Sequence, residues 1–271
     1  MPAESDLSKH PTMTMVLFDG CPACRPDPRR FRRGAVMPLY GGAKSCYGDV
    51  MSSQETQTVF IPVAEIPRGL AGDLACPDGA RGLVIFAHGS GSSRMSPRNR
   101  LVARRLQDDG MATLLFDLLT EEEAANRANV FDIGLLARRV GAAIAWARAF
   151  PSTSSLPIGL FGASTGAAAA LVAAARAPDS VTAIVSRGGR PDLAGDSLPA
   201  VKAATLLIVG GEDREVIALN EAALASLASE KAIEIVPGAT HLFEEPGTLV
   251  SVMDLAADWF SAHLGNPAPQ Q

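Results

Sequence analysis

Short, almost uninterrupted apolar runs recur between residues 82 and 236, and they constrain the fold more than any other feature of the sequence. They span residues 82–87, 111–116, 158–161, 181–185, 205–209 and 232–236. Each run has the length of a strand but lacks the alternation of apolar and polar residues that marks a strand with one face in water. A strand buried on both faces has this pattern, so the runs predict a parallel sheet that is covered on both sides.

Two further strands are predicted ahead of these runs, and helical patterns lie between the runs. Residues 59–63 and 70–75 can form two edge strands, separated by a turn at 67–69. Apolar residues recur at helical spacing within 133–147 and again within 249–260. Strands that alternate with helices predict an α/β fold with a mostly parallel sheet and helices on both faces. The connection between the sixth and seventh strands is short, so we expect no large lid domain.

The charge balance and the distribution of apolar residues exclude some classes of partner. The chain has 29 acidic and 24 basic residues, a formal net charge of −5, whereas nucleic-acid binders usually carry a basic excess. No apolar run reaches the roughly 18 residues needed to cross a bilayer, and the N-terminus lacks the pattern of a secretory signal. We therefore expect a cytoplasmic protein without a nucleic-acid or membrane partner. The sequence indicates no oligomeric state.

The two ends of the chain differ in composition from the middle. Residues 1–55 mix proline, arginine and glycine without periodicity, so we expect a disordered extension before a domain at 56–265, with a disordered tail at 266–271. The extension holds three of the four cysteines, Cys21, Cys24 and Cys46. A zinc site needs four ligands, and the remaining candidates stand at irregular spacing. We expect no metal and no cofactor.

A serine stands where the fifth predicted strand meets an alanine-rich helical segment. The motif reads Gly162-Ala163-Ser164-Thr165-Gly166. The pattern GxSxG at a strand–turn–helix junction is typical of a nucleophile elbow, a turn so sharp that glycines must flank the serine. Ser164 is therefore the predicted nucleophile.

An aspartate and a histidine follow in the order that this type of site requires. Asp213 comes just after the strand at 205–209, and His241 lies in the loop after the strand at 232–236. The carboxyl ends of parallel strands meet at one edge of a sheet, so both should lie near Ser164. Imidazole can remove the serine proton, and a carboxylate orients the imidazole. Glu212 is the neighbouring acidic alternative.

The loop after the third strand, at residues 88–91, is the expected second half of an oxyanion hole. That hole needs two backbone N–H groups: Thr165 should supply one and Ser90 the other, with Gly89 as the alternative to Ser90. His88 should hydrogen-bond the loop. A dinucleotide-binding interpretation of Gly89-x-Gly91 is disfavoured because its third glycine position holds Arg94.

Two arginines follow the sixth strand at the same edge of the sheet. Arg187 or Arg190 could bind a substrate carboxylate or phosphate, because a planar guanidinium suits bidentate recognition of anions. The alternative is an ion pair with Asp117, Asp192 or Glu244 that shapes the edge.

The chain from 58 to 264 resembles the small α/β-hydrolases of the dienelactone-hydrolase group. The matching segments are 86–92, 116–119, 162–166, 186–190, 211–213 and 238–241. The resemblance implies an eight-stranded, mostly parallel sheet, hydrolysis of carboxylic esters or lactones, and no cofactor. Dienelactone hydrolases themselves carry a cysteine nucleophile where this chain has Ser164, which indicates an ordinary serine esterase.

These observations predict a serine hydrolase that cleaves a small or medium ester, lactone or thioester through an acyl-enzyme on Ser164. One alternative keeps the triad but changes the acceptor, giving an acyltransferase or a peroxide-using enzyme. Another is a non-catalytic binding protein on a hydrolase fold.

Overall fold

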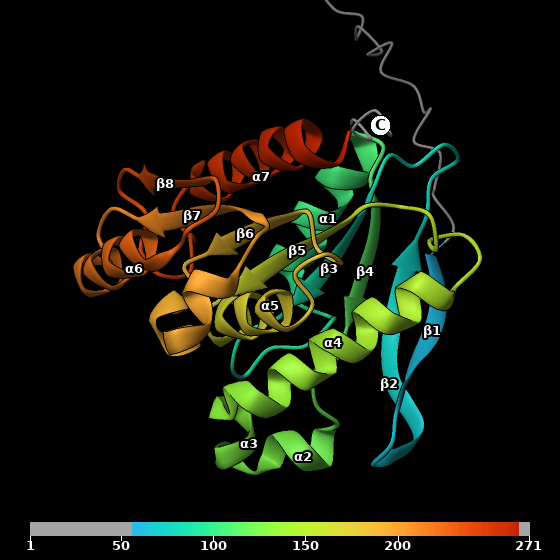
Figure 1. Ribbon diagram of the computed structural model, residues 1–271. Coiled ribbons are helices and arrows are strands. Elements are labelled where there is room, and N and C mark those ends of the chain that lie inside the picture. Colours follow the sequence, from blue (N-terminus) through green and yellow to red (C-terminus); the bar gives the residue numbers. More distant parts are fainter. Residues whose placement is uncertain (1–55, 266–271) are drawn as a thin grey trace, which may run out of the picture. The chain divides into compact units, whose positions relative to one another are not determined.

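The computed structural model describes residues 56–265, which belong to one compact unit of the chain and form a single eight-stranded sheet (Figure 1). The strands are β1 (Thr56–Val63), β2 (Ile66–Ala75), β3 (Leu83–Ala87), β4 (Ala112–Phe116), β5 (Ile158–Ala163), β6 (Ala183–Arg187), β7 (Ala204–Gly210) and β8 (Lys231–Val236). The expectations for residues 1–55, including Cys21, Cys24 and Cys46, and for 266–271 lie outside the described residues.

The sheet is mostly parallel, as predicted. Its strand order is β1-β2-β4-β3-β5-β6-β7-β8. Every pairing from β4 through β8 is parallel, whereas β1 pairs with β2, and β2 with β4, in antiparallel fashion. The carboxyl ends of the last six strands therefore lie along one edge, where the loops that carry the candidate site begin.

Helices cover both faces of the sheet. They are α1 (Pro97–Asp108), α2 (Glu121–Ala125), α3 (Arg127–Phe131), α4 (Ile133–Ala149), α5 (Thr165–Arg176), the 3₁₀ segment η1 (Pro191–Ala200), α6 (Arg214–Ser226) and α7 (Thr248–Leu264). Figure 1 shows α1 and α7 on one side and α4 and α5 on the other. None of the helices among the described residues is long and apolar enough to span a membrane.

Side chains along β3 show why its apolar run does not alternate with polar residues. Leu83 and Ile85 belong to the core cluster beneath α4 and α5. Val84 and Phe86 belong to the cluster beneath α1 and α7. Consecutive strand residues point to opposite faces, so a strand with a core on each side must be apolar throughout.

Three local expectations at the edges of the sheet were wrong. β2 is not an edge strand, because it pairs with β4 as well as β1. The turn between these strands lies at 64–65, and the segment 67–69 belongs to β2. At Gly69, whose φ is 73°, a Cβ would lie 2.5 Å from the Ile61 carbonyl oxygen. β8 is an edge strand rather than one buried on both faces, and Ile235 in it is exposed.

Candidate active site

Ser164 forms the sharp turn between β5 and α5. Its φ is 50° and its ψ is −123°, an unusual conformation for a residue with a side chain. A Cβ on Gly162 would lie 2.4 Å from the Ala167 Cα, and one on Gly166 would lie 2.1 Å from the Ala87 carbonyl oxygen. Both glycines are therefore required sterically, and the geometry is that of a nucleophile elbow.

Asp213 and His241 meet at the same edge of the sheet. Asp213 precedes α6 at the end of β7, and its Oδ2 lies 2.7 Å from His241 Nδ1. Because a carboxylate accepts, this bond puts the imidazole proton on Nδ1 and leaves Nε2 free to accept a proton. Ser164 and His241 line one cavity of about 160 Å³. The hydrogen bond goes to Asp213, the predicted acid, and not to Glu212.

The loop that carries His241 is held by a residue that sequence reasoning missed. Glu245 accepts hydrogen bonds from the Thr240 hydroxyl at 2.6 Å and from the Thr240 N–H at 3.1 Å. The hydroxyl bond, with backbone N–H groups, lowers the pKa of the Glu245 carboxyl. Phe243 is buried in the same loop at a φ of 55°. A glutamate five residues after a threonine belongs to no recognised motif, so no signal marked this contact.

The loop after β3 lies directly against the predicted nucleophile. A Cβ on Gly89 would lie 2.9 Å from the Ser164 Cβ. Ser90 and Thr165, the two predicted oxyanion donors, both line a second cavity of about 650 Å³. The loop is therefore placed where its N–H groups could serve an oxyanion beside Ser164, and the two donors stay a prediction.

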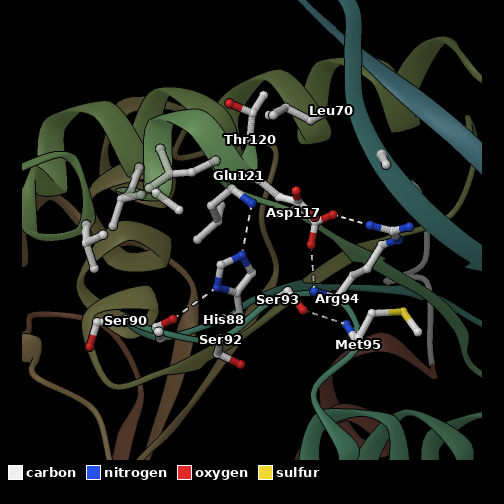
Figure 2. A pocket seen from close by; sticks show the side chains of 18 of the residues that line it. Leu70, His88, Ser90, Ser92, Ser93, Arg94, Met95, Asp117, Thr120 and Glu121 are labelled. Atoms are coloured by element: carbon white, nitrogen blue, oxygen red, sulfur yellow. Dashed lines mark hydrogen bonds and ion pairs between the residues drawn. The ribbon is translucent and has the colours of Figure 1, made fainter. Parts of the chain in front are cut away.

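His88 ties this loop to the one after β4, as Figure 2 shows. Its Nε2 accepts the Leu118 N–H at 3.0 Å, so the proton lies on Nδ1, which donates to the Gly89 carbonyl at 3.0 Å. Burial lowers the pKa of His88. The neutral imidazole thus connects two loops by hydrogen bonds, as expected for a residue that hydrogen-bonds the loop.

Arg94 and Asp117 pair at the wall of the larger cavity (Figure 2). Asp117 accepts hydrogen bonds from the Arg94 side chain and, at 2.8 Å, from its backbone N–H. Arg94, which stands where a dinucleotide-binding motif would have its third glycine, therefore pairs with Asp117. Asp117 is thereby engaged by Arg94 rather than by Arg187 or Arg190.

The two arginines at the carboxyl end of β6 and just beyond it have different surroundings. Arg190 forms a bidentate ion pair with Asp192, with both N···O distances 2.8 Å. Arg187 is only 7% exposed, and its Nη2 lies 3.4 Å from Asn99 Oδ1. Arg187 lines the small cavity with Ser164 and His241. The ion-pair alternative thus describes Arg190, whereas a substrate-binding role stays a prediction for both.

No three potential metal ligands gather within residues 56–265. Cys76, the cysteine that the structure describes, is a free thiol.

Comparison with known proteins identifies the family. The model of the dienelactone hydrolase family matches residues 70–260. A solved dienelactone hydrolase from Anabaena variabilis is 56% identical, with a TM-score of 0.75 over 78% of this chain and 98% of its own. Est1E from Butyrivibrio proteoclasticus shares the fold at 16% identity, with a TM-score of 0.66 over 77% of this chain and 99% of its own.

Two curated Mycobacterium tuberculosis proteins, from strains CDC 1551 and H37Rv, are similar but longer. Each is 58% identical over 219 residues, covering 81% of this chain and 48% of the relative, and each is provisionally named a phosphoribosyl transferase. This chain therefore spans about half the length of these relatives. The family match covers most of the chain and agrees with the elbow, the sheet and the position of Asp213 and His241. The chain belongs to the dienelactone hydrolase family, and its domain is a hydrolase domain of the class that acts on ester bonds.

Proposed function

We propose that this domain hydrolyses small or medium carboxylic esters, lactones or thioesters through an acyl-enzyme on Ser164. The observation that carries the proposal is the 2.7 Å bond between Asp213 and His241 in a cavity that Ser164 also lines. A serine hydroxyl becomes a useful nucleophile only when a base removes its proton, and the Asp213 bond leaves His241 Nε2 available for that task.

In the proposed first half-reaction, Ser164 Oγ attacks the carbonyl carbon while His241 takes the hydroxyl proton. The backbone N–H groups of Ser90 and Thr165 bind the oxyanion of the tetrahedral adduct. The imidazolium then donates its proton to the leaving oxygen or sulfur, the bond from the carbonyl carbon to that atom breaks, and the acyl group remains on Ser164. Asp213 stabilises the imidazolium throughout.

In the second half-reaction, water replaces the leaving alcohol. His241 takes a proton from the water as its oxygen attacks the acyl carbon, and then returns that proton to Ser164 Oγ as the acid departs. An acyltransferase or a peroxide-using enzyme would differ only in the molecule that enters at this step. Hydrolysis is distinguished from these alternatives by measuring how much of the acyl group goes to water and how much to an added alcohol or peroxide.

The transferase name of the longer relatives does not conflict with this proposal. The family match at 70–260 necessarily overlaps the segment shared with those proteins, which extends over 219 residues. We assign any phosphoribosyl transfer to the part of the relatives that this chain does not span.

Labelling with a fluorophosphonate probe tests the proposal, because such probes react only with an activated serine. We expect one adduct by intact mass, mapped to Ser164 and absent from Ser164→Ala. We also expect Ser164→Ala to lower kcat for p-nitrophenyl esters by more than about 10⁴-fold. A folded protein that takes up no probe and cleaves no ester would contradict the proposal and favour the non-catalytic binding protein.

A further inference from the structure

His241 lies in a loop that is neither helix nor strand. The loop covers residues 237–247, between the end of β8 and the start of α7. Ala239 and Phe243 in this loop are buried, whereas the residues between them are exposed or half-buried. The segment 240–242 therefore connects two buried positions through solvent, and His241 is its central residue.

The hydrogen bond to Asp213 fixes one atom of the His241 ring but not the backbone that carries the ring. Asp213 Oδ2 lies 2.7 Å from Nδ1, and this is the one side-chain hydrogen bond of His241 within residues 56–265. A general base must stay within hydrogen-bond reach of the group whose proton it takes, here Ser164 Oγ. A displacement of about 1 Å can lower the rate by about 100-fold. The backbone of the segment 240–242 therefore needs a support of its own.

Glu245 provides this support at the residue that precedes His241. One of its carboxylate oxygens accepts the Thr240 hydroxyl at 2.6 Å, and the other accepts the Thr240 N–H at 3.1 Å. The carboxylate thus holds both the side chain and the backbone of Thr240. Because a rigid peptide unit joins Thr240 to His241, fixing the first limits the movement of the second.

Glu245 is itself fixed by the first residue of α7. Its carbonyl accepts hydrogen bonds from the Thr248 hydroxyl at 2.8 Å and from the Thr248 N–H at 3.1 Å. Thr248 is buried, and α7 packs on the sheet through the core cluster that also contains Phe243. The hydrogen bonds therefore connect the core, through α7 and Glu245, to the residue beside His241.

The chemistry of a carboxylate suits this position. An ionised carboxylate has two oxygens and only accepts, which matches the two donors of Thr240. The bond from the Thr240 hydroxyl, followed by bonds from backbone N–H groups, holds the pKa of the Glu245 carboxyl below its usual value of 4.5. Glu245 is therefore ionised at neutral pH. The neighbouring Glu244 has a different partner, because it pairs with Arg98 in α1 at 2.8 Å.

We propose that Glu245 is a positioning residue for the general base. Through Thr240 it holds His241 where the imidazole can take the Ser164 proton and deliver it to the leaving oxygen. Glu245 itself exchanges no proton with the substrate. The proposal rests on the proposed hydrolase function and adds to it a residue that controls the placement of the base.

Two butyrate esters with different leaving groups test this role in Glu245→Leu. The alkoxide of ethyl butyrate leaves only with a proton from His241, whereas p-nitrophenolate is a stable anion that leaves without one. A misplaced imidazole should therefore lower kcat/KM by about tenfold for p-nitrophenyl butyrate and by about 100-fold or more for ethyl butyrate. A partly unfolded variant, or one that binds the butyryl group less well, would lose the same factor with both esters.

A conservative variant and a neighbouring one serve as controls. Glu245→Gln should recover most of the loss, because an amide can accept the Thr240 N–H and donate to the Thr240 hydroxyl. Glu244→Leu removes an adjacent, exposed carboxylate and should keep both kcat/KM values within about threefold of the wild type. Thr240→Val removes only the hydroxyl donor and should show the unequal losses of Glu245→Leu in smaller measure. It keeps the test decisive if Glu245→Leu does not fold.

Three results would overturn the proposal. They are equal losses for the two esters, no loss in either Glu245→Leu or Thr240→Val, and a Glu245→Gln variant as slow as Glu245→Leu. After any of these, cleavage of both esters by the wild type and labelling of Ser164 would leave the hydrolase function standing. A wild-type chain that cleaves neither ester and takes up no fluorophosphonate probe would overturn both the proposed function and the role of Glu245.

Discussion

Arg187 and Arg139 are both buried, but only Arg139 forms ion pairs with carboxylates. Arg139 in α4 is 3% exposed and pairs with Glu65 at 3.0 Å and Glu123 at 2.8 Å. Arg187 has a similar burial and no acidic partner. These ion pairs explain Arg139 as a structural residue, because they join α4 to the turn between β1 and β2 and to α2. No carboxylate among the described residues pairs with Arg187, so ion pairing does not account for its burial.

His88 should make the stability of the domain depend on pH. Its pKa is lowered by burial from the ordinary value of 6.5, so below that pH the unfolded chain binds a proton at this residue more readily than the folded protein does. Protons bound preferentially by the unfolded state destabilise the fold. The contribution of His88 is therefore fully present above 6.5 and declines as the pH falls toward its folded pKa.

We expect His88→Gln, which can still accept the Leu118 N–H, to lose less stability between pH 7 and pH 5 than the wild type does. Urea denaturation at the two pH values measures the difference in unfolding free energy for each protein. His263→Gln is a control, because that histidine lies in α7, where its ring nitrogens contact Glu230 at 3.2 Å and the Trp259 carbonyl at 2.7 Å and not the loops that His88 joins. Equal losses in His88→Gln and the wild type would show that His88 does not titrate in this range.

The position of Ser164, Asp213 and His241 at one edge of the sheet could be predicted from the sequence, whereas the surroundings of the two arginines could not. Ser164, Asp213 and His241 each follow a strand that an apolar run marks, and parallel strands bring their carboxyl ends together. Arg187 is the last residue of β6, and Arg190 follows it by three residues. Which of them meets an acid depends on the path of the chain beyond the strand, and η1 brings Asp192 to Arg190. Local sequence does not determine that path.

At the scale of elements, burial explains which ones could be predicted. The helices α4 and α7 have apolar residues at helical spacing because each packs along the sheet. Neither α2 nor α3 contains a buried residue, so no apolar periodicity marks them. Thr120 and Glu123 instead form a capping box that starts α2. These two unmarked helices wall the larger cavity.

We expect the larger cavity to hold the acyl group of the substrate. The side chain of Val130, which lines this cavity from α3, should then limit the length of the acyl chain that fits. We expect Val130→Trp to lower the ratio of kcat/KM for p-nitrophenyl octanoate to that for the butyrate by about tenfold, since misplaced methylenes cost about 1–3 kcal/mol in a filled pocket. Phe131→Trp enlarges a neighbouring side chain that is 49% exposed, and it should leave the ratio near that of the wild type. Equal ratios in all three proteins would show that the acyl group does not lie in this cavity.

At the scale of the whole molecule, the candidate site is assembled from distant segments along one edge of the sheet. The loops after β3, β5, β7 and β8 contribute Ser90, Ser164, Asp213 and His241, and β6 contributes Arg187 at its last residue. All of them lie between residues 56 and 265, as do the two cores that cover the sheet. The described region thus contains every part that the proposed reaction uses.

This completeness predicts that the domain works without the residues that precede it. A chain that begins at Met51, the first residue of the compact unit that contains the sheet, should fold cooperatively and keep kcat/KM for p-nitrophenyl butyrate within about twofold of the full chain. Thermal unfolding and steady-state kinetics of the two chains measure this directly. The same truncation combined with Ser164→Ala provides the background rate. A shortened chain that folds but loses activity would mean that residues 1–50 complete the site. One that does not fold would mean that they stabilise the sheet, and either result would overturn the assignment of the active domain to residues 56–265.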